Sequence, residues 1–177
     1  MWCDMTYRTK TYIAGDWTGD SDLIDQLHKW NESEYWGLHF VDAHDYAQAR
    51  DTSLNCSIKA SLRKRLDCSK RFVLVVGPGT SKLRAGSCSY CDDYMAASHD
   101  CWRSRSVDLR SYIQYECEYA AHYIDDIIVL YNASSILRED CPELLRKTGK
   151  HISAYRWNDD GSFSWCYREI KEAFDRP

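Results

Sequence analysis

The stretch Phe72-Val73-Leu74-Val75-Val76, followed at once by Gly77-Pro78-Gly79, decides the fold of this chain. A continuous apolar run, rich in β-branched residues and stopped by a turn signal, is typical of a strand buried on both faces of a parallel sheet. We therefore expect this strand at the centre of the sheet.

The segments on either side of this strand alternate between strand and helix patterns. Apolar residues at helical spacing predict, for example, a long helix with Leu109, Ile113, Cys117, Ala120 and Ala121 facing inward. The alternation predicts an α/β fold, a doubly wound parallel sheet of about five strands with helices on both faces. We expect one domain over residues 1–177. The expected strands are 11–14, 38–41, 72–76, 127–131 and 152–156, and the expected helices are 22–30, 58–67, 107–123, 141–147 and 163–174.

Residues 80–106 interrupt the alternation, and we expect them to form a Cys-rich insertion over one end of the sheet. Within it, Cys88-Ser-Tyr-Cys91, with His99 and Cys101 close behind, has the ligand types and spacing of a tetrahedral structural zinc site. The metal ligands would be Cys88, Cys91 and Cys101. A second Cys-x-x-Cys pair is missing, so free cysteines remain the favoured interpretation. A redox pair is disfavoured because the motif does not open a helix after a first strand.

The overall composition excludes several classes of protein. Twenty-three basic and 27 acidic residues give a net charge of -4, which offers no general attraction to nucleic acid or to an anionic membrane. The apolar runs are too short to span a bilayer, and the N-terminus lacks a signal-peptide pattern. An odd number of cysteines, nine, then indicates mostly reduced thiols. We expect a cytoplasmic protein.

In a doubly wound sheet, ligands bind beyond the carboxyl ends of the strands, where the strand order reverses. This rule nominates the loops 15–21, 42–53, 77–106 and 131–135. In the second loop, His44, Asp45 and Arg50 could hold ribose hydroxyls or a pyrophosphate, and helix capping or mutual pairing is the alternative. Standard dinucleotide folds, nucleoside triphosphatases and serine hydrolases are disfavoured, because their glycine-rich and nucleophile-elbow motifs are missing.

Two carboxylates, Glu116 and Glu118, lie two positions apart on the long helix and therefore on different faces. Glu116 follows Tyr112 by four residues, so these two share a face that could look into the strand-end cleft, and we expect Tyr112 to contact the substrate there. Glu118 is more easily placed near solvent. From spacing alone, Glu116 is simply an acidic residue on an amphipathic helix, and surface exposure is the better expectation.

Several short blocks occur in an order that resembles the bacterial TIR-like family, which includes the TIR protein of the Thoeris anti-phage system. The resemblance covers residues 9–135 closely and the remainder loosely. Each block alone is weak, but their combination is specific. The blocks are Lys10-Thr-Tyr-Ile-Ala-Gly-Asp16, Phe40-Val-Asp-Ala-His-Asp45, Ala49-Arg-Asp-Thr-Ser53, Ile58-Lys through Arg65-Leu66, Phe72-Val-Leu-Val-Val-Gly77 and Tyr115-Glu-Cys-Glu118.

The resemblance implies a flavodoxin-like TIR fold that consumes NAD by breaking the bond between nicotinamide and ribose. Thoeris members make a cyclic ADP-ribose isomer or a related signal, a diffusible product that activates a partner effector, and TIR enzymes of this kind can require self-assembly. The family's catalytic glutamate matches Glu116. The implied lining of the NAD pocket is Gly15 and Asp16 after the first strand, with His44, Asp45 and Arg50 after the second.

Two other functions compete with an NAD-cleaving enzyme. A TIR-like interaction module would recruit partners through its surfaces without turnover. A phosphoacceptor receiver domain shares the topology but is disfavoured, because the clustered acids expected at its strand ends are not matched. The resemblance therefore implies an NAD glycohydrolase or ADP-ribosyl cyclase in bacterial defence, with the non-catalytic module as the alternative.

Overall fold

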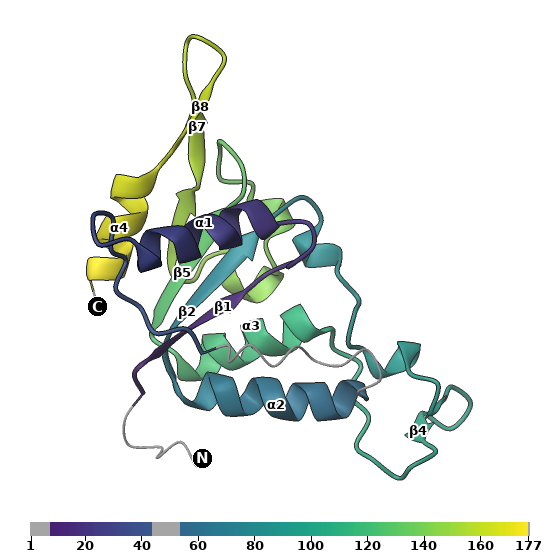
Figure 1. Ribbon diagram of the computed structural model, residues 1–177. Helices are drawn as coiled ribbons and strands as arrows, with labels where there is room; N and C mark the ends of the chain where they lie inside the picture. The colour runs from purple at the N-terminus through teal and green to yellow at the C-terminus, as the bar shows by residue number, and fades with distance from the viewer. Residues whose placement is uncertain (1–7, 44–53, 177) are drawn as a thin grey trace.

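A four-stranded parallel sheet forms the centre of the molecule (Figure 1). The computed structural model describes residues 8–43 and 54–176. The strands lie in the order β1-β2-β5-β6, so the chain crosses over the sheet between sequential strands, as in the predicted α/β fold. Their bounds are β1 Lys10–Ala14, β2 Ser69–Val76, β5 Asp126–Tyr131 and β6 Lys150–Ser153.

The predicted central strand is confirmed, because β2 pairs with β1 on one side and β5 on the other. All residues from Phe72 to Val76 are at most 2% exposed. Phe72 and Leu74 belong to the apolar cluster on one face of the sheet, and Val73 and Val75 belong to the cluster on the other. The run is continuous because both faces of β2 are covered.

The prediction of a strand at 38–41 is wrong. In the described structure these residues form no strand, and the chain makes only an isolated parallel bridge to β1 just after them, between Asp42 and Thr11. The cause is local, because Gly37 and His39 have positive φ angles of 39° and 53°, which an extended strand does not allow. The neighbouring Leu38 and Phe40 are still buried. With this segment beside β1, the order along the sheet is the flavodoxin-like one.

Helices cover both faces of the sheet, as predicted (Figure 1). On one face, α1 and α4 bury residues such as Leu27 and Ile170 against the sheet. On the other, α2 and α3 contribute residues such as Leu66 and Cys117. The bounds are α1 Ser21–Glu32, α2 Asn55–Asp67, α3 Tyr112–Tyr123 and α4 Tyr167–Asp175.

Helix α3 begins later than the expected residue 107. Ser111 and Gln114 form a capping box that satisfies the backbone N–H groups at each other's positions and so fixes the start of the helix. Leu109, which was expected to face inward, therefore precedes the helix and is 55% exposed. The predicted inward positions of Ile113, Cys117 and Ala120 are confirmed, and Ala121 is partly buried.

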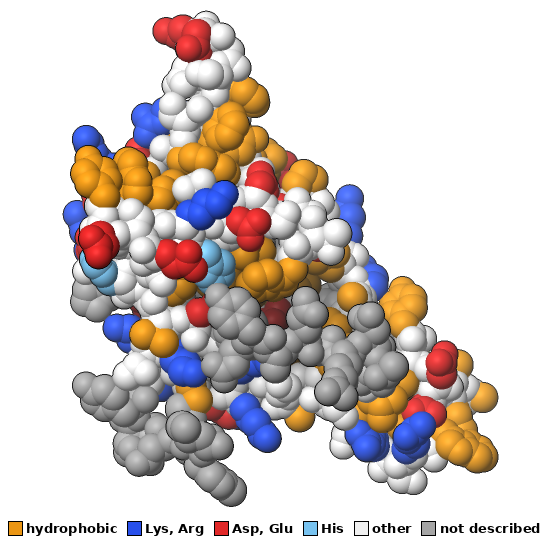
Figure 2. Space-filling view, viewed as in Figure 1, with side chains coloured by type: hydrophobic (Ala, Val, Ile, Leu, Met, Phe, Trp, Pro, Cys, Tyr) orange, Lys and Arg blue, Asp and Glu red, His pale blue; other side chains and the backbone are white. Residues whose placement is uncertain are grey.

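The expected helix at 163–174 is partly wrong, because Phe163–Trp165 forms strand β8, which pairs antiparallel with β7, Tyr155–Trp157. Opposed aromatic pairs, Tyr155 with Trp165 and Trp157 with Phe163, stabilise this hairpin. The short helix expected at 141–147 is reduced to the 3-10 turn η4, Glu143–Leu145, which follows another such turn, η3, Arg138–Asp140. Figure 2 shows hydrophobic side chains gathered on the hairpin and its base.

The insertion at 80–106 is built from short pieces and projects beyond the N-terminal start of α2 (Figure 1). These pieces are the 3-10 turns η1 Thr80–Lys82 and η2 Cys88–Tyr90, and the two-residue strands β3 Tyr94–Met95 and β4 Asp100–Cys101. Within the described residues, no helix combines the length and apolar character needed to cross a membrane.

Candidate functional site

Glu116 on α3 points into the interior and is only 7% exposed. The Tyr12 hydroxyl on β1 donates a hydrogen bond of 2.5 Å to its Oε1. The Tyr12 ring is fully buried and stacks on Phe72 of the neighbouring strand, with 5.8 Å between the ring centroids. The sheet therefore fixes the position of the hydroxyl group that holds the carboxylate.

The environment of Glu116 changes its acidity. Burial raises its pKa to about 7, although the hydrogen bond from Tyr12 and the charge of Arg65 act in the opposite direction. Burial, followed by the nearby Glu116 charge, raises the pKa of Tyr12 well above its ordinary value, so the proton stays on the tyrosine. A carboxyl group that titrates near neutral pH inside a protein is typical of a site with a chemical role.

Glu118, the second carboxylate, has a different environment. Its side chain is 42% exposed and forms a 2.9 Å ion pair with Arg110. The spacing correctly predicts Glu118 near solvent. Surface exposure, which spacing alone favours for Glu116, is wrong, because the helix face that carries Glu116 packs against the sheet.

Gly15 and Asp16 lie at the carboxyl end of β1, as the sequence predicts, and both are partly exposed. A side chain at Gly15 would bring its Cβ to 3.0 Å from the Cβ of Val75, so glycine permits the close approach to β2. Asp16 accepts a 3.0 Å hydrogen bond from the backbone N–H of Thr18. The other three residues expected to line an NAD pocket, His44, Asp45 and Arg50, lie outside the described residues.

A buried aspartate, which the sequence analysis did not single out, connects the loop after β1 with the ends of β2 and β5. Asp20 is 2% exposed and accepts a 3.0 Å hydrogen bond from Asn132, which follows β5. Its carboxylate lies over Gly77, just after β2, where an added Cβ would be 2.1 Å from Oδ1. Burial raises the pKa of Asp20, against the hydrogen bond from Asn132. Asp20 precedes the first residue of α1, a position where aspartate is common as a helix cap, so sequence offered only a structural role.

Tyr112, one turn before Glu116, lies at the junction with the insertion. Its hydroxyl donates a 2.9 Å hydrogen bond to Asn55 at the start of α2. Its ring packs so closely on Gly86 that an added Cβ would meet it at 2.3 Å. The contacts that the structure gives Tyr112 are therefore with α2 and the insertion, and its suggested role in substrate binding stays a prediction.

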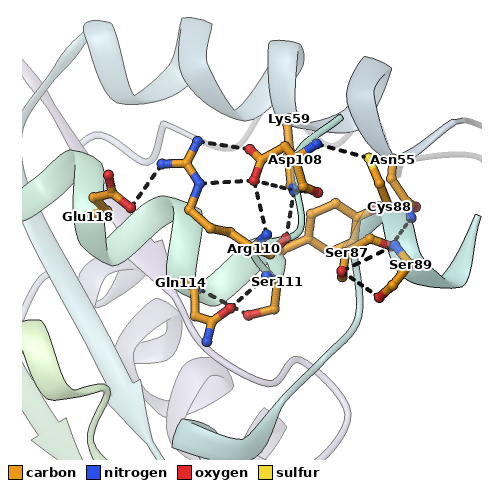
Figure 3. A network of polar contacts seen from close by, with 11 residues as sticks. Asn55, Lys59, Ser87, Cys88, Ser89, Asp108, Arg110, Ser111, Gln114 and Glu118 are labelled. Carbon is orange, nitrogen blue, oxygen red and sulfur yellow. Dashed lines mark hydrogen bonds and ion pairs between the residues drawn. The ribbon is translucent and has the colours of Figure 1, made fainter. Parts of the chain in front are cut away.

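A polar network anchors the first turn of α3 to α2 and to the insertion (Figure 3). The buried Lys59 donates hydrogen bonds to the carbonyl oxygens of Asp108, at 3.1 Å, and Arg110, at 2.6 Å. Arg110 in turn makes a bidentate contact with the carboxylate of Asp108. This network holds the start of the helix that carries Glu116, which favours a defined position for that carboxylate.

The cysteines proposed as zinc ligands, Cys88, Cys91 and Cys101, are free thiols. Within residues 8–43 and 54–176, no three His, Cys, Asp or Glu side chains are arranged so that they could hold a metal ion. His99, the fourth candidate, makes a 2.9 Å hydrogen bond with Tyr94. The arrangement therefore adds no support to the zinc hypothesis.

Comparison with known proteins gives one family match. Residues 12–85 match the model described as "Thoeris protein ThsB, TIR-like domain". This range includes Tyr12, Gly15 and Asp16 and ends before α3. A comparison with curated proteins gives no match.

Among solved structures, the chain is similar to a metazoan TIR-STING receptor from C. gigas in complex with 2′,3′-cGAMP. The TM-score is 0.48 and the sequence identity 16%, over 97% of this chain and 40% of that one. The chain thus spans less than half of the length of that receptor.

Proposed function

We propose that this chain, which matches the Thoeris ThsB TIR-like family model over residues 12–85, cleaves NAD between nicotinamide and ribose. The proposal depends chiefly on Glu116, a buried carboxyl group whose pKa lies at about 7 and which Tyr12 contacts directly. The position of this residue on the helix after the insertion is the one that the family resemblance assigns to the catalytic glutamate.

The chemistry needs one carboxylate in its ionised form. Departure of nicotinamide leaves positive charge on the ribose, and an anion held beside it stabilises that charge. The Tyr12 hydrogen bond favours the ionised form of Glu116, whereas burial opposes it. We therefore expect cleavage to increase with pH through about 7, as the fraction of ionised Glu116 rises.

The rest of the proposed pocket lies at the carboxyl end of β1. Gly15 and Asp16 would contact the ribose or pyrophosphate of NAD, together with His44, Asp45 and Arg50. Glu116 is nearly enclosed, so we propose that a trigger or self-assembly rearranges the site before NAD reaches the carboxylate. Purified protein alone would then be less active than protein exposed to its trigger.

The fate of the ribosyl cation decides the product. Water gives ADP-ribose, whereas a nucleophilic atom of the same ADP-ribose, held close in a dry pocket, gives a cyclic isomer. We propose the cyclic product as a diffusible signal to a partner effector in anti-phage defence, because Thoeris members make such signals.

A non-catalytic interaction module is the second candidate, and the enclosure of Glu116 is the observation that favours it. In that case the buried acid would serve only the internal structure of the domain, and partners would bind elsewhere on the surface.

The test compares wild-type protein with Glu116→Gln and with Glu118→Gln as a matched control on the same helix. Each is incubated with NAD, alone and with extract of phage-infected cells, and nicotinamide and cyclic products are followed by mass spectrometry. We expect Glu116→Gln to lose cleavage by about 100-fold or more, and Glu118→Gln to retain it. Equal behaviour of wild type and Glu116→Gln under both conditions would reject the enzyme and favour the interaction module.

A further inference from the structure

Four free cysteines line one small pocket between the start of α2 and the insertion. Cys56 comes from α2, Cys88 is the first residue of η2 and Cys91 follows it, and Cys101 lies on β4. The first of these stands 32 residues before the second in the sequence, so folding alone brings it to the insertion. The cavity measures about 20 Å³, which is room for about one water molecule and not for an organic ligand.

The chemistry of this pocket is therefore that of the thiols themselves. The described residues contain no group arranged to hold a metal ion. Clustered thiols that are accessible and partly ionised react with peroxides and then with one another. The question is which of the four sulfur atoms has these properties.

Cys56 is the most reactive thiol of the cluster by geometry. It is half-buried, and the guanidinium of Arg105 donates a 3.3 Å hydrogen bond to its sulfur and a 3.1 Å bond to the adjacent Ser57 hydroxyl. Burial raises the pKa of Cys56, but the hydrogen bonds and charge of Arg105, with help from Ser57, outweigh burial and lower it. A cation beside a partly exposed thiol is the usual environment of a reactive cysteine.

Cys101 is the best placed reaction partner. It lines the same small pocket as Cys56, and it raises the pKa of Arg105, as Cys56 does more strongly through its hydrogen bond. Cys101 is half-buried as well. Cys88 differs, because it is buried and its sulfur accepts a 3.3 Å hydrogen bond from the backbone N–H of Asp108 (Figure 3).

We propose that Cys56 is a peroxide-sensitive thiol and that Cys101 converts its oxidised form into a disulfide that joins α2 to the insertion. The Cys56 thiolate attacks hydrogen peroxide, so that a sulfur–oxygen bond forms, the O–O bond breaks and hydroxide leaves as water after taking up a proton. The Cys101 sulfur then attacks the sulfenic acid of Cys56, and a second water leaves. Two thiols are oxidised and one peroxide is reduced to two waters.

The experiment treats the reduced full-length protein with one equivalent of hydrogen peroxide, blocks the remaining thiols by alkylation, and maps non-reduced peptides by mass spectrometry. We expect a cross-link between Cys56 and Cys101 in the wild type and in Cys91→Ser, and its loss in Cys56→Ser and Cys101→Ser. The buried Cys141 and Cys166 serve as internal references that stay unmodified.

A second measurement tests the role of Arg105 without peroxide. Arg105→Gln is expected to slow alkylation of Cys56 at pH 7 by about 3- to 10-fold, because the cation that favours the thiolate is lost. Arg103→Gln is the matched control, since Arg103 pairs with Asp93 at 2.8 Å. The rate in this control should equal that of wild type.

Three results would overturn the proposal. Cys56 could react with peroxide no faster than Cys141, the cross-link could join Cys56 to a residue other than Cys101, or the purified protein could hold one zinc ion per chain through these thiols. All three are measured without NAD, so failure here is separate from failure of the proposed NAD cleavage.

Discussion

Two buried ionisable side chains, one on each face of the sheet, have opposite environments. On the face covered by α1 and α4, the buried Arg71 is paired with Asp126 at 2.5 Å and lies over the Phe174 ring. On the face covered by α2 and α3, the hydrogen bond described for the buried Glu116 comes from Tyr12, an uncharged group. A paired charge serves the structure, whereas an acid left with a raised pKa is available for chemistry.

The largest effect is expected where the paired charge is broken. Asp126→Asn leaves the Arg71 guanidinium buried without its counter-charge, which should lower the free energy of unfolding by about 3–4 kcal/mol. Chemical denaturation measures this change, with Asp125→Asn, an exposed neighbour, as the control that stays near wild type. A loss below about 1 kcal/mol would show that this face does not depend on the pair.

The buried acid Glu116 should make stability depend on pH. Burial raises the pKa of Glu116 from 4.5 to about 7, so the folded state binds the proton more tightly than the unfolded state. The free energy of unfolding should therefore fall as pH rises from about 4.5 and level off above about 7, with a total loss of about 3 kcal/mol. Denaturation at a series of pH values measures the loss.

Glu116→Gln should remove this part of the pH dependence, because a glutamine side chain does not ionise. Glu118→Gln, which removes a largely solvated acid of the same helix, should retain it. Identical slopes for wild type and Glu116→Gln would mean that the pKa of Glu116 is the same in the folded and the unfolded protein.

A smaller effect is expected from removal of the Tyr12 hydroxyl. Tyr12→Phe deletes the hydrogen bond that lowers the pKa of Glu116, so that pKa should rise above its wild-type value of about 7. A bond to a charged group is worth about 2 kcal/mol, and the half-maximal pH of NAD cleavage should move upward. NMR titration of the Glu116 carboxyl carbon measures the same shift without turnover. An unmoved titration would leave Tyr12 with a packing role only.

The smallest effect should come from exposed ion pairs. Lys171 on α4 contacts Asp175 at 2.6 Å, four residues further along the helix. Lys171→Ala should change the free energy of unfolding by less than about 0.5 kcal/mol, because water and salt screen such pairs. Thermal unfolding of this variant beside Asp126→Asn gives the contrast between a surface pair and a buried one.

The sequence predicts the strands that are buried on both faces, because Phe72–Val76 and Ile127–Tyr131 have to be apolar at every position. It does not reveal that residues 38–41 fail to pair as a strand, since the positive φ of His39 has no sequence signal of its own. The hairpin of β7 and β8, by contrast, has a recognisable signal in the sequence. Alternating aromatics and Asp160-Gly161, where the glycine has a φ of 80°, are typical of a tight turn between strands.

The candidate site also has a part that the sequence predicts and a part that depends on tertiary packing. The resemblance selects Glu116 over Glu118, but the burial of Glu116 depends on Tyr12, which is 104 residues away in the sequence. Three of the four cysteines in the thiol cluster could be predicted to lie together, because Cys88, Cys91 and Cys101 are close in the sequence. Cys56 joins them only through the packing of α2 against the insertion, which no local pattern encodes.

The hairpin of β7 and β8 differs from the sheet in the order in which it is expected to form. Its aromatic pairs join residues at most ten positions apart in the chain, so loop closure costs little and the hairpin should form within about 1–10 µs. The sheet requires contacts between distant segments and should form more slowly. During folding, Trp157, whose ring contacts are with Tyr155 and Phe163 of the same hairpin, would therefore reach its final environment before the central strands assemble, and its fluorescence would report an early event.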